Sequence, residues 1–399
     1  MPRAVVVLPT TTYRAADFIS AADSLGVDLV VASEEPPPFD MGDRYLQIDC
    51  SNPGSAAEAV AALGDTIPLD GVLAADDGGV LIAAMAGSRL GLAANHPDAA
   101  AATRDKRLLR ERLRKAEVPQ PDFAPISEDD EASEAAQAIG FPVVVKPTTR
   151  SASQGVIRAD TAAEVVTAVK TIRHIVGQTE SLLVEEFMEG TEVAVEGLVT
   201  DSQLSVLAVF DKPDSGTGPV FPETILITPS RLPAADLAEV ERVAAAAVRG
   251  LGLTHGPVHI ELKILDGRAR VIEVAARSIG GLCSRSLSFG LMDTTLETLI
   301  LRNSLGLDKP ELRREAMANG VLMIPIPQTG LLEAIHGIDE ARTIAGVTGV
   351  DITIPPGNRV LATPEGDRYL GFVFARTDTP EAAETSLRKA MERIEVQIS

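Results

Sequence analysis

Two glutamates on consecutive strands carry the strongest chemical signal in the sequence. The segment HIELKILDGRARVIEVAAR predicts a β-hairpin with strands over 258–265 and 270–275 and a three-residue turn around Gly267. Counting outward from this turn places Glu261 directly opposite Glu273, and paired side chains on neighbouring strands share a face. Two facing carboxylates repel each other unless a cation lies between them, and oxygen ligands favour Mg²⁺ held jointly with substrate phosphates. The alternative is a solvated hairpin face on which lysine and arginine side chains neutralise the acids.

Further polar residues extend this face and the edge of a neighbouring sheet. His259 and Lys263 flank Glu261, and Arg277 continues the face beyond Glu273. A guanidinium can hold a carboxylate through two parallel hydrogen bonds. Asp76-Asp77 ends an apolar strand, where ligand crevices lie in open α/β sheets. A helix-capping role fits the two aspartates equally well.

A lysine and a hydroxyl-rich loop form a second candidate group. Lys146 ends the apolar strand FPVVVKP, and the loop TTRSASQGV follows over 148–156. Such a loop can offer backbone N–H groups and hydroxyls to a phosphate. A lysine at a strand end more commonly extends its charge to solvent, so the pattern alone is a weak indication of phosphate binding.

The elements that must position these residues follow from apolar patterning. Residues 1–100 alternate short apolar strands with Ala-rich helices, which predicts a parallel α/β sheet, and TTTYRA stands where a dinucleotide fingerprint would be. Seven basic and two acidic side chains occupy 104–115, a predicted helix. It could contact a phosphate, although such a run of charges most often forms a solvated face. Strands are predicted over 182–187 and 192–199, a helix over 234–251, and a smaller α+β unit after residue 303.

Composition excludes several classes of protein. The 399 residues are 45% hydrophobic and 23% charged, which is typical of a globular chain and excludes a disordered one. A net charge of −21, with 3% aromatic residues and no Trp, argues against nucleic acid or a membrane as partner. The two cysteines form no disulfide framework or zinc motif, and no apolar run is long enough to span a bilayer. We therefore expect a cytoplasmic protein.

Four segments, taken in order, resemble the ATP-grasp superfamily. They are RDKRLLRERLRKAEVPQP, FPVVVKPTTRSASQGV, LLVEEFMEGTEVAVEG and HIELKILDGRARVIEVAARSIGG, and the resemblance covers about 101–305. The VHIELK strand and the AAR-x-x-GG ending look most like the L-amino-acid (dipeptide) ligase branch, which has a biotin-carboxylase-like architecture. The resemblance implies a mixed α/β and α+β fold in three parts. These are a Rossmann-like domain over 1–100, an ATP-grasp core over 101–305 with a lid at about 125–190, and a C-terminal domain over 306–399.

The resemblance also implies roles for individual residues. Lysines would hold the nucleotide phosphates, residues 149–156 would close over them, Glu185 to Met188 would recognise adenine and Glu192 would bind the ribose. The expected nucleotide contacts are Lys106, Lys146, Ser151, Ser153, Gln154, Gly155, Glu185, Glu186, Phe187, Met188 and Glu192. Glu261 and Glu273 would hold Mg²⁺ or Mn²⁺. Arg277 and Lys146 would be catalytic, with Arg277 facing an acyl phosphate and the attacking amine.

The second substrate region is implied with less detail. The expected substrate contacts are Glu223, His259, Arg277, Gly280 and Gly281. Glu223 falls near an acid that contacts an amino group, and glycine at 281 is expected to leave a larger pocket. Ala275 stands where many relatives have an asparagine that ligates the metal, so a third ligand is absent there. RSIGGLC replaces the continuation found in biotin carboxylase, which argues against bicarbonate chemistry.

The implied activity is ATP-dependent joining of a small carboxylate to an amine through an acyl phosphate, most simply between two amino acids. The expected cofactors are ATP and Mg²⁺, and a homodimer is an expectation at the level of the family. Three alternatives stay open at this point. They are another ATP-grasp chemistry such as a purine-pathway ligase, a non-amino-acid carboxylate as substrate, and a nucleotide-binding protein without catalysis.

Overall fold

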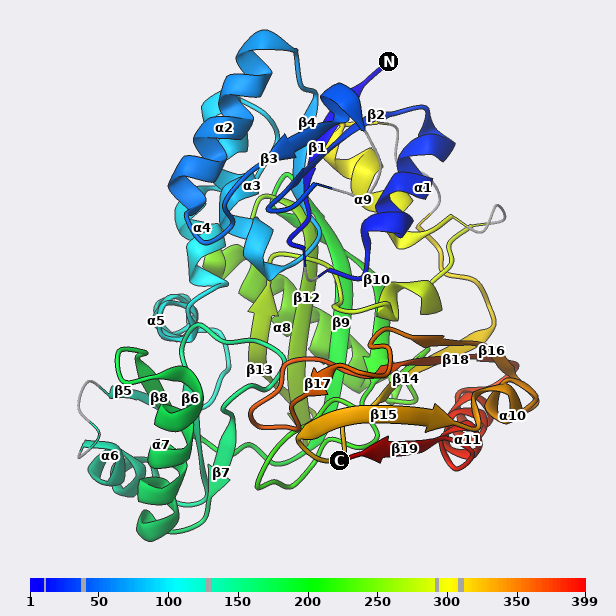
Figure 1. The fold of residues 1–399 in the computed structure, drawn as a ribbon. Coiled ribbons are helices and arrows are strands. Elements are labelled where there is room, and N and C mark those ends of the chain that lie inside the picture. Colours follow the sequence, from blue (N-terminus) through cyan, green and yellow to red (C-terminus); the bar gives the residue numbers. More distant parts are fainter. Residues whose placement is uncertain (11, 37–40, 127–128, 130, 291–293, 308–311) are drawn as a thin grey trace.

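The computed structural model describes residues 1–10, 12–36, 41–126, 129, 131–290, 294–307 and 312–399. Four sheets organise these residues, and the largest runs through the middle of the molecule (Figure 1). The expected combination of α/β and α+β regions is confirmed. Among the described residues, no helix is long and apolar enough to cross a membrane.

The N-terminal sheet is parallel, as the alternating pattern predicts. Its order is β3-β2-β1-β4, and β1 is buried along nearly its whole length. Continuous apolar strands are typical of parallel sheets whose two faces are both covered by helices. The strands are β1 (Arg3–Val7), β2 (Asp28–Ser33), β3 (Tyr45–Gln47) and β4 (Gly71–Ala74), and the helices are α1 (Ala15–Leu25), α2 (Pro53–Thr66), α3 (Asp77–Leu90) and α4 (Pro97–Ala102).

An eight-stranded sheet forms the centre of the molecule, in the order β13-β12-β9-β10-β11-β14-β18-β16. Helix α8 covers one of its faces (Figure 1) and contributes Val240, Val243 and Ala247 to the core. The elements on this side are β9 (Thr191–Thr200), β10 (Gln203–Asp211), β11 (Ile225–Thr228), α8 (Ala234–Leu251), β12 (His255–Leu265) and β13 (Arg268–Ala275). The sequence pattern missed β10, because its first half is only partly buried and lacks an unbroken apolar run.

The β12–β13 hairpin pairs Glu261 with Glu273 as predicted, but its turn is shorter than predicted and a β-bulge makes up the difference. Its turn has two residues, Asp266 and Gly267, both with positive φ, and Leu265 pairs with Arg268 rather than Ala269. A β-bulge at Ile272 then shifts the register by one residue and restores the Glu261–Glu273 pair. Arg110 stabilises this bulge, because its guanidinium donates to the backbone oxygens of Val271 and Ile272.

A smaller antiparallel sheet lies beside the centre, in the order β5-β8-β6-β7, and helices α6 and α7 pack on it (Figure 1). It falls within the predicted lid. Its elements are β5 (Phe123–Ile126), α6 (Glu131–Ile139), β6 (Val143–Pro147), β7 (Ile157–Ala159), α7 (Ala162–Val176) and β8 (Leu182–Glu186). Helix α5 (Lys106–Lys115) precedes this sheet, and Asp105 caps its N-terminus.

The C-terminal region contains both helices and strands, as expected, but its strands do not form one separate sheet. β14, β16 and β18 continue the central sheet past the predicted boundary at 305, and β15, β17 and β19 form a small sheet. The elements are α9 (Leu296–Ser304), β14 (Ala318–Ile324), β15 (Gly330–His336), α10 (Ile338–Arg342), β16 (Val347–Ile352), β17 (Arg359–Val360), β18 (Gly371–Thr377), α11 (Pro380–Met391) and β19 (Glu395–Ile398). The three domain boundaries stay predictions.

Candidate active site

The Glu261–Glu273 pair lies where two cavities meet. One cavity is lined by four lysines, by Phe221 and by the segment Glu185–Met188 at the end of a strand. The other measures about 440 Å³, within the range of small-molecule sites, and is lined by Arg277, His259 and residues 279–281. Both cavities are lined by Ser151, Ser153, Glu223, Glu261 and Glu273. A group transferred between the two cavities would therefore pass these five side chains.

Basic side chains approach both glutamates of the pair, and Lys106 Nζ donates a hydrogen bond to Glu273 Oε1. Glu273 has Lys106 Nζ at 3.2 Å, and Glu261 has Lys212 Nζ at 3.5 Å and His259 Nε2 at 3.6 Å. Burial opposes ionisation of Glu261, but Lys212 and then His259 hold its pKa well below the usual range. Two facing carboxylates suit a hard divalent cation, which prefers oxygen ligands. The solvated-face alternative does not describe Glu261, since Glu261 lines both cavities.

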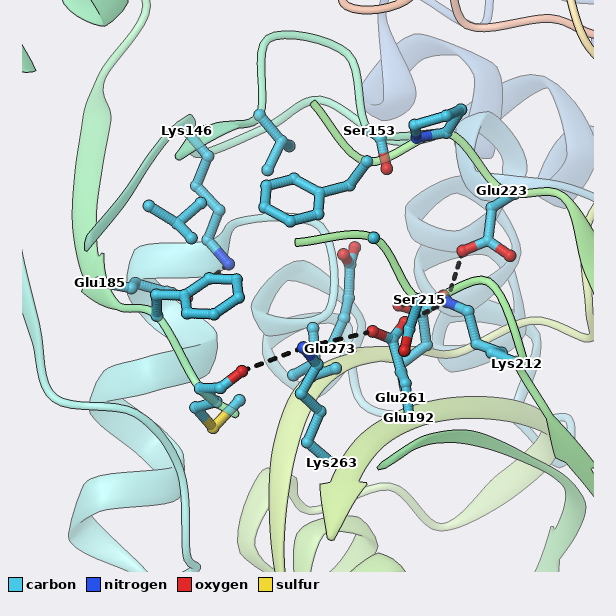
Figure 2. A pocket seen from close by; sticks show the side chains of 18 of the residues that line it. Lys146, Ser153, Glu185, Glu192, Lys212, Ser215, Glu223, Glu261, Lys263 and Glu273 are labelled. Carbon is cyan, nitrogen blue, oxygen red and sulfur yellow. Dashed lines mark hydrogen bonds and ion pairs between the residues drawn. The ribbon is translucent and has the colours of Figure 1, made fainter. Parts of the chain in front are cut away.

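Lys212 is the centre of a three-carboxylate cluster that the sequence analysis missed (Figure 2). Its ammonium forms ion pairs with Glu192, Glu223 and Glu261, and its side chain is only 7% exposed. Burial lowers the pKa of Lys212, but the three carboxylates raise it well above its usual value. Lys212 directly follows the apolar strand end LAVFD, as Lys146 follows VVV, and this pattern could have identified it.

Replacing Lys212 by Met should destabilise the protein. Three carboxylates with oxygens within 4.8 Å of one another would lose their shared cation, and breaking a buried ion pair costs about 3 kcal/mol. Urea denaturation of K212M should show this loss. Millimolar Ca²⁺ should restore part of it by replacing the ammonium, while K212R should need no such rescue. An unchanged unfolding curve for K212M would contradict the electrostatic account of the cluster.

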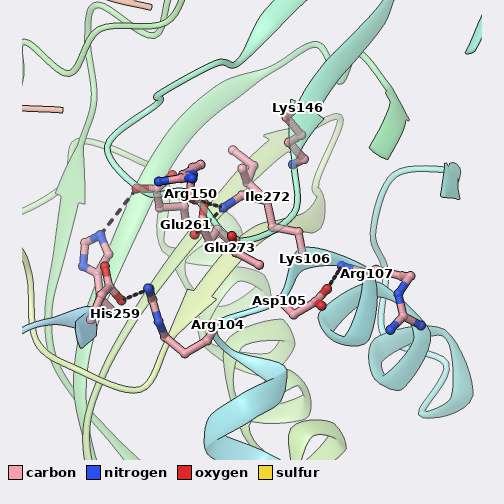
Figure 3. A network of polar contacts seen from close by, with 12 residues as sticks. Arg104, Asp105, Lys106, Arg107, Lys146, Arg150, His259, Glu261, Ile272 and Glu273 are labelled. Atoms are coloured by element: carbon pink, nitrogen blue, oxygen red, sulfur yellow. Dashed lines mark hydrogen bonds and ion pairs between the residues drawn. The ribbon is translucent and has the colours of Figure 1, made fainter. Parts of the chain in front are cut away.

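Two lysines, Lys146 and Lys106, approach the first cavity from different elements (Figure 3). Lys146, at the end of β6, pairs with Glu185 Oε2 at 2.6 Å, and Arg110 of α5 forms a fork on the same carboxylate. Burial raises the pKa of Glu185, but Arg110 and Lys146 lower it to about 2. Lys106, in the first turn of α5, donates to the backbone oxygen of Arg150. The solvated-face interpretation of 104–115 is therefore wrong for Lys106 and Arg110, which are buried.

The loop at 149–156 places only part of its sequence at the cavities. Ser151 and Ser153 line both cavities, and Ala152, Ser153 and Gly155 have positive φ. Gln154 and Gly155 line neither. Gln154 Nε2 donates to Glu365 O at 2.8 Å, and Gly155 N donates to Pro364 O at 2.9 Å. Their side of the loop is thus attached to the C-terminal segment.

A slot of apolar side chains continues the first cavity beyond the lysines. Phe187 and Phe221 stack at 6.2 Å between ring centres, and Met188 lies alongside. Lys263 Nζ lies 4.9 Å from the Phe187 ring centre and donates to Met188 O. Glu186 also lines this cavity, with its carboxylate paired to Arg270. Flat apolar walls beside backbone polar groups can bind a planar heterocycle.

Arg277 faces the second cavity and is held by the N-terminal region. Its Nη2 donates to Asp77 Oδ2 at 3.1 Å, and its Nη1 donates to Ser278 O. Burial raises the pKa of Asp77, but Arg277 and Arg104 lower it to about 2. Asp76 is at the N-cap position of α3 but makes no side-chain cap. The crevice interpretation of the Asp76-Asp77 pair is therefore the better one for Asp77.

His259 connects this cavity to the core. Its Nδ1 lies 3.1 Å from Glu196 Oε2, which also accepts from Ile279 N at 3.0 Å. Burial lowers the pKa of His259, but the Glu196 and Glu261 carboxylates, which accept from its ring N–H groups, raise it to about 9. His259 is thus a cation at neutral pH and adds positive charge beside Glu261.

The expectation that glycine at 281 enlarges the pocket is wrong. A Cβ there would lie 2.6 Å from the ring of Phe372, and φ is +59°. The aromatic ring therefore fills the space, although Gly280 and Gly281 both line the second cavity.

Both cysteines should be unreactive in the folded chain. Burial, followed by a hydrogen bond to Glu34, raises the pKa of Cys50 to about 12, and burial raises that of Cys283 further. The thiolate fraction of Cys50 at about pH 8 would be roughly one in ten thousand. Iodoacetamide labelling followed by mass spectrometry should modify both cysteines in urea and neither without it. Rapid labelling of native protein would contradict this.

Comparison with known proteins shows the same organisation. An ATP-grasp domain model matches residues 139–286, an ATP-grasp N-terminal domain model matches 19–93, and an L-amino acid ligase C-terminal domain 2 model matches 322–399. The chain is an ATP-grasp ligase. Together the three models cover most of the N-terminal sheet, of the central sheet and of the C-terminal region.

Individual relatives of this ATP-grasp ligase point to one branch. The alanine–anticapsin ligase of Bacillus subtilis is 30% identical over 49% of the chain, and the chain spans about half (46%) of that relative's length. The uncharacterized protein y4rH of Sinorhizobium fredii is 23% identical over the whole chain and 84% of its own length. An L-amino acid ligase from Bacillus licheniformis shares the fold, with a TM-score of 0.84, 23% identity, and coverage of 100% and 99% of the two chains. The ATP-grasp ligase is therefore close to L-amino acid ligases.

More distant structures of this fold were solved with nucleotides. N5-carboxyaminoimidazole ribonucleotide synthetase, in complex with ADP, has a TM-score of 0.73 at 15% identity and covers 98% of this chain and 96% of its own. The biotin carboxylase domain of a Hydrogenobacter thermophilus carboxylase, in complex with MgADP, has a TM-score of 0.70 at 17% identity and covers 99% of this chain and 90% of its own.

Proposed function

We propose that this ligase joins a small carboxylate to an amine at the expense of ATP, through an acyl phosphate. The carrying observation is that Glu261 and Glu273 lie on the border shared by the two cavities. The side chains that line the first cavity suit ATP, because the lysines can bind its phosphates and the apolar slot can hold its base. The carboxylate and amine would occupy the second cavity, and two amino acids are the simplest pair.

The proposed reaction has two successive steps, and each forms one bond and breaks another. A carboxylate oxygen attacks the γ-phosphorus of ATP, and the bond from that phosphorus to the ADP oxygen breaks. The amine nitrogen then attacks the acyl carbon, phosphate leaves and the nitrogen loses a proton. The products are an amide, ADP and phosphate.

The chain's own side chains supply what this sequence of steps needs. Lys106 and Lys146 would hold phosphate oxygens, and Arg277 would orient the carboxylate and then the acyl phosphate with its remaining N–H groups. Glu261 and Glu273 fit Mg²⁺, which would neutralise charge on the transferred phosphoryl group. The loop at 149–156 would exclude water from the acyl phosphate, since that species hydrolyses readily.

The remaining contacts also divide between the two cavities, with the nucleotide in the first and the carboxylate and amine in the second. Glu192 would take the ribose hydroxyls, and Phe187, Met188, Glu185 and Glu186 would surround the base, partly through backbone groups. Glu223 would accept a hydrogen bond from an amino group of the substrate, because its carboxylate reaches the second cavity. Gly280 and Gly281 would bring backbone close to the substrate.

Phosphate release and product mass test this function together. The purified chain would be incubated with MgATP and single or paired L-amino acids, with mass spectrometry of the products. Release that requires a pair, with the mass of the condensed product, is the expected result. Release with one acid alone would mean that the acyl phosphate is lost to water for want of the right amine. ATP binding without release for any carboxylate would favour a protein without catalysis.

A further inference from the structure

A single carboxylate at the second cavity holds two guanidinium groups. Asp77, the first residue of α3, lies with Oδ1 2.9 Å from Arg104 Nη1 and with Oδ2 3.1 Å from Arg277 Nη2. The three residues come from separate parts of the chain, since Arg104 lies between α4 and α5 and Arg277 follows β13. All three line the second cavity.

Unused donors remain on Arg104 after this contact is formed. The Asp77 carboxylate is shared between two guanidiniums. Asp76 and Glu273 act on Arg277 but are not in an ion pair with Arg104. Arginine has five N–H donors. Among the described residues, the Arg104 side chain forms an ion pair with one partner, Asp77. The Arg104 side chain is 28% exposed and so can meet a ligand. Such a guanidinium fits an anion through paired hydrogen bonds.

The position of Arg104 narrows the identity of that anion. Arg104 lines the second cavity but not the lysine-lined one proposed for ATP, so a nucleotide phosphate is not the anion it fits. The carboxylate that becomes activated belongs beside Arg277 and the metal-binding acids, where phosphoryl transfer takes place. The Arg104 guanidinium lies next to this reaction centre, where it can bind a second anionic group of the substrates that does not itself react.

We propose, resting on the function above, that Arg104 binds a carboxylate of the amine substrate. The amine is then an α-amino acid or a peptide, rather than a simple amine, and its own carboxylate stays free in the product. Asp77 is a positioning residue that fixes Arg104 and Arg277 relative to each other (Figure 3 shows Arg104 at the site). Arg104 thereby determines specificity for the amine.

The test compares an amine substrate with its uncharged analogue. With the pair identified by mass spectrometry, the wild-type chain should use the carboxamide of the amine partner with a KM at least about tenfold higher than the free acid, since a charge-assisted contact is lost. R104Q should raise the KM for the free acid by about tenfold or more. R104Q should leave the KM values for the carboxamide and for ATP unchanged. R104K should retain part of the preference, since it keeps the charge without the fork.

A matched control separates binding from folding. Arg285 forms a similar ion pair with Asp17 of the N-terminal region at 3.0 Å, yet lines neither cavity. R285Q should therefore leave the KM values for both amines unchanged. If R104Q does not fold, R104K and the wild-type comparison still decide the matter.

Several outcomes would overturn the assignment. A wild-type chain that uses the carboxamide as well as the acid has no carboxylate site for the amine. Equal KM increases for acid and carboxamide in R104Q would show a structural role. An increase in KM for the activated acid alone would place Arg104 at the acyl site. Failure of the wild type to form any amide would instead overturn the proposed function, and this assignment with it.

Discussion

Replacing Arg277 by Gln should reduce amide formation by about a hundredfold or more, with MgATP affinity close to that of the wild type. Arg277 lines the second cavity and not the lysine-lined one, so it can act on the acyl group without contributing to nucleotide binding. Its guanidinium is oriented by Asp77 and Ser278, which leaves further N–H groups for developing negative charge. Removal of one such preorganised donor typically costs a hundred- to a thousandfold in turnover.

Arg277→Lys is the informative companion. It keeps a positive charge but loses the planar fork, so it should recover only part of the lost rate. The measurement is kcat for the coupled product alongside total phosphate release, with R285Q as the control. A larger share of phosphate released without amide is expected in R277K, because a poorly held acyl phosphate is more exposed to water. Near-normal turnover in R277Q would remove Arg277 from the mechanism.

Glu261→Gln and Glu273→Gln should each reduce turnover about a hundredfold and raise the Mg²⁺ concentration needed for half-maximal activity. The two carboxylates face each other across the β12–β13 hairpin at the border of both cavities. A neutral amide keeps the shape but removes the charge that a hard cation needs. Turnover would be measured over a Mg²⁺ titration, and EDTA should abolish wild-type activity until Mg²⁺ or Mn²⁺ is added.

Glu333→Gln is the matched control for this pair. Glu333 is also a strand glutamate, on β15, but it is exposed and lines neither cavity. E333Q should keep the wild-type rate and Mg²⁺ dependence. An unaltered Mg²⁺ requirement in both E261Q and E273Q would show that the metal is held elsewhere.

Local sequence patterns predicted much of the fold and the facing glutamates. Apolar alternation gave the parallel N-terminal sheet, and the 234–251 helix has the predicted bounds. The Glu261–Glu273 pairing is right although the predicted turn is wrong, because the extra residue at Ile272 compensates for the shorter turn. A bulge depends on a distant partner, here Arg110, and so leaves little local signal.

What the sequence did not predict depends on contacts between distant segments. Lys212 gains its importance from Glu192 and Glu261, which lie on other strands. Gln154 was expected at the nucleotide but bonds to Glu365, 211 residues later in the chain. The Arg104–Asp77 contact likewise joins two segments whose own patterns indicate only a basic helix and a strand end. Placement of such charges follows from tertiary packing rather than from spacing.

The most direct test of the central claim follows one oxygen atom. A carboxylic acid substrate labelled with ¹⁸O in its carboxylate would be incubated with the chain, MgATP and the amine partner, and the products analysed by mass spectrometry. The account predicts an amide, ADP, and phosphate carrying one ¹⁸O from the acid, because that oxygen becomes the bridge of the acyl phosphate. Unlabelled phosphate alongside labelled AMP, or amide formed without ATP cleavage, would contradict it.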